Sequence, residues 1–287
     1  MQKNRILLSL GLLAALSVGL IWFGLSQEVS PDSNAAPVSQ AVPPTPVSQE
    51  ETPDPADWRL CLVNPWHPLP EGYQPQLTQV ENGHQVDSRC AADLEAMLAD
   101  CRAAGHAPLL CSSYRTQEKQ TQLYNNLVQK QIARGNSRSE AMAKAAKEVA
   151  VPGTSEHQLG LSADLTGKEA NEWLAEHCWE YGFILRYPEG KKDITGIIND
   201  TWHFRYVGQP HAAIMEARGL TLEEYIAWLR EFPYESCRYQ EKNAIVSFLP
   251  GASDGPTILK RDSDLPCTIS GNNVDGFIIT EWRRAHG

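Results

Sequence analysis

The stretch Ser155-Glu-His-Gln-Leu-Gly-Leu-Ser-Ala-Asp164 places His157 and Asp164 seven residues apart, with a glycine between them. The residues that precede it, 151–155, contain Pro and Gly and are expected to form a loop. Residues 161–165 are expected to form a short strand. His157 is therefore predicted on the loop, and Asp164 on the strand that returns from it.

A second polar stretch is Asp200-Thr-Trp202-His203. Its histidine, His203, lies thirty-nine residues after Asp164. Two imidazoles and one carboxylate suit a catalytic zinc ion and leave its fourth position for water. Zinc lowers the pKa of such a water molecule and polarises a bound carbonyl group. Asp200, close to His203, is the candidate base for the proton of that water. The spacing alone is also compatible with polar residues that are simply hydrogen-bonded within a fold.

Both stretches resemble the metal motifs of the VanY/VanX group of zinc D,D-peptidases, S-x-H-x-x-G-x-A-x-D and E-x-W-H. The resemblance extends to Ser112-Ser-Tyr-Arg115-Thr, to the later Gln120 and to residues 182–191, and it covers roughly residues 58–232. The fold that it implies is α+β, with a small mixed or antiparallel sheet and flanking helices around a zinc cleft, as in VanY, VanX and Hedgehog.

The resemblance also implies roles for individual residues. One zinc ion per chain is expected, with the ligands His157, Asp164 and His203. Arg115 is expected to hold the terminal carboxylate of the substrate or to polarise the scissile carbonyl, for which a planar guanidinium is well suited. Ser155 and Gln120 match positions that line the cleft and are expected to bind substrate.

Two positions depart from the family pattern. Ser162 stands where the motif has Ala, which is a change between two small residues. Asp200 stands where the family has its general-base Glu, so the carboxylate is retained on a side chain that is one methylene shorter. Asp200 and Arg115 are therefore the expected catalytic residues.

The implied activity is zinc-dependent hydrolysis of the C-terminal D-Ala-D-Ala bond of peptidoglycan stem pentapeptides, in cell-wall remodelling. One alternative is an endopeptidase of the same fold that cuts an L-Ala-D-Glu bond or a cross-bridge. A second alternative is a catalytically silent, metal-stabilised wall-binding module, which the change at Asp200 favours.

The N-terminus predicts a membrane anchor. Lys3 and Arg5 precede an apolar segment, 6–25, that is long enough to span a bilayer as a helix. The segment ends in bulky residues and not in the small ones of a signal-peptidase site, and its basic flank favours a cytoplasmic N-terminus. Residues 1–26 are thus a predicted single-pass signal anchor in the bacterial cell membrane, with the catalytic domain outside the cytoplasm. Residues 27–56, rich in proline, are a predicted disordered spacer.

The rest of the chain predicts two further segments. Helices are expected at about 88–104, 116–134, 139–150, 173–181 and 221–232, the last opened by a capping box of Thr221 and Glu224. Strands are expected at 108–114, 161–165, 183–187 and 202–207, and their irregular mixing with helices indicates an α+β catalytic domain over 57–235. Strand-like runs at 244–249 and 276–280 predict a small β appendage over 236–287.

Charge and cysteine content limit the partners and the redox chemistry. The net charge is -10 without a basic stripe, which disfavours nucleic-acid binding. The predicted partners are peptidoglycan stem peptides and the membrane, and no protein partner is predicted. Seven cysteines in an exported domain allow up to three disulfides and one thiol.

Overall fold

The computed structural model describes residues 49–52, 58–232, 234–239, 242–261 and 265–284. The predicted anchor, 1–26, lies outside the described residues, as does most of the predicted spacer, 27–56. No helix in these five ranges is long and apolar enough to cross a membrane. One part of the spacer prediction is wrong: strand β1 (Gln49–Glu51) pairs antiparallel with strand β10 (Leu259–Arg261). Edge strands present unpaired backbone groups that a second extended segment can satisfy, whatever its side-chain pattern.

A four-stranded antiparallel sheet carries the two polar stretches. Its order is β4-β5-β7-β6, with β4 at Leu109–Ser112, β5 at Ser162–Thr166, β7 at Asp200–Tyr206 and β6 at Phe183–Tyr187. All three neighbouring pairs are antiparallel. The two inner strands, β5 and β7, are thus adjacent although a long segment of chain separates them.

The main core is formed where helices cover this sheet. Helix α1 (Ala91–Ala103) buries Leu94, Met97, Leu98 and Cys101, the residues whose helical spacing predicts it. They pack in one cluster with Ala163 and Leu165 of β5 and with Leu174 of helix α4 (Lys168–His177). This packing holds β5, and with it Asp164, on a rigid support.

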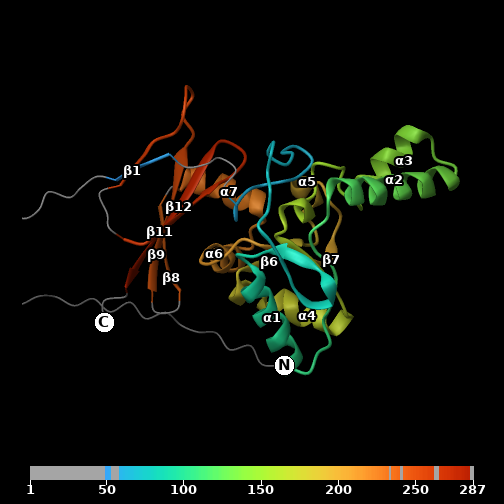
Figure 1. The fold of residues 1–287 in the computed structure, drawn as a ribbon, viewed down its shortest axis with the longest axis horizontal. Coiled ribbons are helices and arrows are strands. Elements are labelled where there is room, and N and C mark those ends of the chain that lie inside the picture. Colours follow the sequence, from blue (N-terminus) through green and yellow to red (C-terminus); the bar gives the residue numbers. More distant parts are fainter. Residues whose placement is uncertain (1–48, 53–57, 233, 240–241, 262–264, 285–287) are drawn as a thin grey trace, which may run out of the picture. The chain divides into compact units, whose positions relative to one another are not determined.

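Two helices form a separate hairpin beside the sheet. Helix α2 (Gln117–Ala133) begins at Thr116, whose side chain accepts a hydrogen bond from the Lys119 amide. Helix α3 (Arg138–Ala145) begins at Ser137 with a capping box and packs on α2 through a small apolar cluster. Both predicted helices are confirmed, and Figure 1 shows them side by side.

The C-terminal sheet is part of the same packed body and is not an appendage. Its order is β11-β12-β9-β8, with β11 at Cys267–Gly271, β12 at Gly276–Arg284, β9 at Lys242–Pro250 and β8 at Tyr234–Tyr239. The predicted boundary between 235 and 236 falls inside β8. Val246 and Ile278 are buried in one core with Ile184 of β6, with helix α6 (His211–Arg218) and with helix α7 (Leu222–Glu231). Strand-like runs were correctly predicted here, but sequence does not reveal which surface they cover.

The remaining elements are short. They are β2 (Leu77–Gln79), β3 (Gln85–Asp87), α5 (Lys192–Thr195) and the 3-10 helices η1 (Glu81–Gly83), η2 (Glu156–Leu159) and η3 (Cys178–Tyr181). The capping box at the start of α7 is present as predicted, because Thr221 and Glu224 each bond the other's backbone amide. The α+β class is confirmed. The upper limit of three disulfides is not reached, since Cys90, Cys101, Cys111 and Cys178 are all thiols.

Candidate active site

Asp164 and His203 lie directly opposite each other on β5 and β7. Side chains of opposite residues in an antiparallel pair project from the same face of the sheet and are in contact distance. Nδ1 of His203 is accordingly 2.9 Å from Oδ1 of Asp164. Strand pairing therefore brings together two residues that are far apart in sequence.

His157 joins them from η2, just before β5. The turn after it requires Gly160, which has φ 75°, and a Cβ atom there would lie 3.0 Å from the backbone nitrogen of Asp87. Nε2 of His157 lies 3.2 Å from Oδ1 of Asp164. One donor atom from each of the three residues falls within 4.8 Å of the others, which is the only such group of three or more metal-binding side chains in the described ranges.

The ring nitrogens that face away from Asp164 each lie near an oxygen atom of another residue. Nδ1 of His157 lies 2.6 Å from the backbone oxygen of Ser113, and Nε2 of His203 lies 3.5 Å from Oε2 of Glu156. With a proton on each of these outer nitrogens, the inner lone pairs of both rings point toward Asp164. Metal-binding histidines characteristically have this arrangement of a donated outer N–H and a free inner nitrogen.

The charges of the group favour a cation at its centre. Burial alone would lower the pKa of His203, but its bonds to Asp164 and Glu156 raise that pKa to about 9. Burial alone would raise the pKa of Asp164, yet the two histidines hold that pKa well below its ordinary value. The site thus stabilises positive charge, from a proton or from a metal ion. The donor set of two imidazoles and one carboxylate fits zinc.

Glu156 anchors this group to the core and was missed by the sequence analysis. Its side chain is completely buried, and Oε1 accepts hydrogen bonds from Nε of Arg186 at 2.8 Å and from Nη1 of Arg205 at 2.7 Å. Burial would raise the pKa of Glu156, but the two guanidinium groups outweigh it and keep the carboxylate ionised. Arg186 also forms two bonds with Glu223 of α7. The only available signal was the position of Glu156 next to His157.

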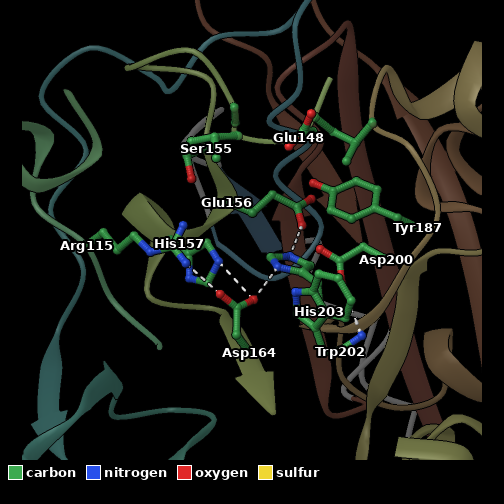
Figure 2. Close-up of a pocket in the computed structure, with 13 residues that line it drawn as sticks. Arg115, Glu148, Ser155, Glu156, His157, Asp164, Tyr187, Asp200, Trp202 and His203 are labelled. Atoms are coloured by element: carbon green, nitrogen blue, oxygen red, sulfur yellow. Dashed lines mark hydrogen bonds and ion pairs between the residues drawn. The ribbon is translucent and has the colours of Figure 1, made fainter. Parts of the chain in front are cut away.

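A cavity of about 250 Å³ opens onto the metal-binding group, and its walls include Arg115, Ser155, Tyr187, Asp200 and Trp202 (Figure 2). The ring of Tyr187 packs on that of His203, with 4.9 Å between their centroids. Asp200 accepts a hydrogen bond from the backbone N–H of Trp202 at 3.1 Å, and burial raises its pKa. Glu148 also lines the cavity and was not expected there.

Arg115 is fixed by neighbours on two sides. Its Nη2 lies 2.5 Å from Oδ2 of Asp164, and its Nε donates to Oγ of Ser112 at 2.9 Å. Gln120, a predicted substrate contact, is instead fully buried behind Arg115 and does not line the cavity. It donates to the backbone oxygen of Ala150 at 2.7 Å, and its Oε1 lies 3.5 Å from Nη1 of Arg115. Gln120 therefore supports the wall and does not form its surface.

The fold and the site define an α+β zinc metallopeptidase. The family model "VanY: D-alanyl-D-alanine carboxypeptidase" matches residues 83–209. A D-alanyl-D-alanine carboxypeptidase of Enterococcus faecalis is 42% identical over 184 residues, which make up 62% of this chain and 69% of the relative. The chain belongs to the VanY family of D-alanyl-D-alanine carboxypeptidases.

Solved structures agree with this assignment. A mutant of the vancomycin-resistance D,D-pentapeptidase VanY, in complex with Zn(II), is 43% identical, with a TM-score of 0.58 over 59% of this chain and 99% of that one. The vancomycin-resistance D,D-dipeptidase VanXYg, in complex with a D-Ala-D-Ala phosphinate analogue, is 29% identical, with a TM-score of 0.72 over 82% of this chain and 98% of that one.

Proposed function

We propose that this chain is a zinc-dependent D,D-carboxypeptidase that removes the terminal D-alanine from peptidoglycan stem pentapeptides. The observation that carries the proposal is a single cavity whose lining combines the metal-binding group with Arg115 and Asp200. His157, Asp164 and His203 would hold the zinc ion. Zinc bound there supplies Lewis acidity, which polarises a carbonyl group and makes water more acidic.

Arg115 is the residue suited to the substrate's C-terminal carboxylate. It lines the cavity, and its Nη1 has a long contact of 3.5 Å as its single hydrogen bond among the described residues. A guanidinium with donors to spare binds a carboxylate strongly and with defined orientation. Ser155 lines the same cavity and provides a hydroxyl for the peptide or the carboxylate. These contacts would orient the terminal residue and select peptides with a free C-terminus.

Asp200 is the proposed proton acceptor. Two carboxylates, Asp200 and Glu148, line the cavity without an ion-pair partner in the ranges that the structure describes. Glu148 is exposed, whereas Asp200 is half-buried and lies three residues before His203 on the same strand. A partly desolvated carboxylate is the better base, because burial raises its proton affinity. In this scheme Asp200 takes a proton from the attacking water and passes it to the leaving amine.

Incubation of the purified chain with muropeptides, followed by mass spectrometry, tests the proposal. The expected product is the stem tetrapeptide together with free D-alanine. Cleavage inside the stem or in a cross-bridge would instead indicate the endopeptidase activity. Unchanged muropeptides in the presence of stoichiometric zinc would indicate a wall-binding module.

The remaining proposal concerns location. Residues 1–26 would anchor the chain in the bacterial cell membrane, and the proline-rich segment that follows would hold residues 57–287 outside the cytoplasm. The support is the long apolar run with its basic flank, together with a substrate that belongs to the cell wall. Membrane fractionation at alkaline pH, combined with protease treatment of spheroplasts, tests it. Recovery of the intact chain in the soluble fraction would contradict it.

A further inference from the structure

A second hollow continues outward from the active-site cavity. Its volume is about 460 Å³, and it shares Arg115, Glu148, Asp200 and Trp202 with the inner cavity. It runs between helix α2 and the segment that leads into β7. A substrate that is longer than the inner cavity can therefore continue into this second hollow, which we call the outer groove.

The walls of the outer groove are apolar on both sides. Leu123 and Leu127 of α2 form one side, and Ile198 and Trp202 lie in the facing segment. Ile198 is 41% exposed and Trp202 is 50% exposed, so large apolar surfaces are open to solvent beside the catalytic group. Exposed apolar surface of this kind, next to a functional cavity, is typical of a ligand-binding groove.

Four charged side chains line the outer groove. Arg115, Glu148 and Asp200 also line the inner cavity, whereas Lys130 lines the outer groove alone. Glu148 and Lys130 are both exposed, and neither takes part in an ion pair between described residues. Arg115 contacts Asp164 of the metal-binding group, and Asp200 is the proposed base. The charges that face the rest of a bound substrate are thus positive at Arg115, negative at Glu148 and, in the outer groove alone, positive at Lys130.

A peptidoglycan stem peptide carries the opposite charges in the same order. Its C-terminal carboxylate is followed, two residues back, by the side-chain amino group of the third residue. The next residue is a γ-linked D-glutamate with a free α-carboxylate. Complementary charges along a binding surface determine register and select partners, even where each pair contributes little free energy.

We propose that the outer groove binds the part of the stem peptide that precedes the scissile bond. Glu148 faces the amino group of the third residue, and Lys130 faces the α-carboxylate of the D-glutamate. Trp202 and Ile198 cover the aliphatic part of the third side chain. This inference rests on the proposed function and extends it from the terminal dipeptide to the whole stem.

The test pairs two enzyme variants with two chemical changes in the substrate. The substrates are a pentapeptide with a lysine at position three, its ε-acetylated form, and a form in which D-glutamate is replaced by D-isoglutamine. The full chain and its variants Glu148→Gln and Lys130→Gln are compared by kcat/KM on each. Lys119→Gln is the matched control, because Lys119 is an exposed lysine of the same helix outside the groove.

We expect acetylation to lower kcat/KM of the wild type about two- to fivefold, the range for an exposed ion pair, and to have no effect on Glu148→Gln. Amidation of the D-glutamate should have a similar effect on the wild type and none on Lys130→Gln. The control should respond to both changes as the wild type does. Both variants should still cleave the substrate that lacks the matching charge.

Two results would overturn the proposal. One is a wild type that cleaves all three substrates equally, and the other is a variant that still discriminates as the wild type does. Failure of the proposed function is distinguishable, because the wild type would then cleave none of the three. In that event, dissociation constants of the uncleaved peptides, measured by calorimetry on the zinc-loaded chain, test the same charge pairs directly.

Discussion

Oε2 of Glu156 lies 3.5 Å from Nε2 of His203, and neither of these buried atoms forms a hydrogen bond within the described residues. This contact determines which of the two ring nitrogens of His203 carries the proton. With that proton directed at Glu156, Nδ1 is left as the metal ligand. Because Glu156 is itself held by Arg186 and Arg205, the ring is oriented from the core of the protein.

Replacement of Glu156 by Gln should therefore weaken zinc binding about 10- to 100-fold, the usual cost of losing such an outer partner. Competition with a chromophoric chelator measures the affinity, and the visible spectrum of the Co²⁺-loaded protein reports on ligand geometry. The matched control is Glu223→Gln, which also removes a carboxylate from Arg186 but has no contact with His203. Equal zinc affinities in the two variants would show that Glu156 has only a structural role.

The three proposed ligands should each be required for the metal. We expect about one zinc ion per chain in the wild type, and none retained in His157→Ala or His203→Ala. Removal of zinc by a chelator should abolish turnover and lower the melting temperature, because a ligand that binds only the folded state stabilises it. Elemental analysis and thermal unfolding provide the measurements. Stoichiometric zinc in either alanine variant would exclude that residue as a ligand.

Arg115 should make the enzyme selective for a free C-terminus. Amidation of the substrate removes the charge that the guanidinium pairs with, so kcat/KM of the wild type should fall about 10- to 100-fold. Arg115→Ala should be slow on both substrates and should barely distinguish them. Its zinc content has to be measured in parallel, because Arg115 also contacts Asp164. Equal cleavage of free and amidated peptides by the wild type would favour the endopeptidase.

Asp200 should be needed for turnover and not for metal binding. Asp200→Asn preserves the shape of the side chain but cannot accept a proton, so kcat should fall about a hundredfold or more. Zinc content should remain at one per chain, since Asp200 is not among the three clustered ligands. Glu148→Gln is the comparison, because it neutralises the other unpaired carboxylate of the cavity. If that variant is the inactive one, the base is Glu148.

His211 should make the fold sensitive to acid. It is fully buried, with Nδ1 2.9 Å from the hydroxyl of Tyr225 and Nε2 3.2 Å from Oγ1 of Thr280. Burial, with a smaller contribution from Arg59, lowers its pKa to about 3. In the unfolded chain the pKa is about 6.5, so between these two values the unfolded state binds a proton that the folded state does not.

The stabilising contribution of neutral His211 is thus present above pH 6.5 and is lost as the pH falls toward 3. Between pH 6.5 and 4.5 the loss should reach about 2–3 kcal/mol of unfolding free energy. His211→Gln, which keeps a neutral hydrogen-bonding side chain, should have a flatter pH dependence by that amount. Urea unfolding of the zinc-free wild type and His211→Gln between pH 6.5 and 4.5 measures this difference in unfolding free energy. Parallel pH profiles of the two proteins would exclude His211 as the cause of the acid sensitivity.

Local sequence was sufficient for several features of this protein. Helix α1 and the capping box of α7 were predicted correctly, because apolar spacing and N-terminal caps act within a few residues of the chain. The zinc chemistry was predicted from the resemblance of the stretch with His157 and Asp164 to the family's metal motif, because the spacing alone left it open. His203 was found through its own motif, without knowledge of which strand lies beside which.

Tertiary structure alone decided the rest, because it depends on contacts between distant segments. The β5–β7 register places Asp164 opposite His203, and no local pattern specifies that pairing. Burial of Glu156 between Arg186 and Arg205 joins residues 30 and 49 positions apart. The C-terminal sheet shares a core with α6 and α7 because its strands cover an apolar surface elsewhere in the chain. Side-chain patterns report that a residue is buried, but the packed fold determines what it is buried against.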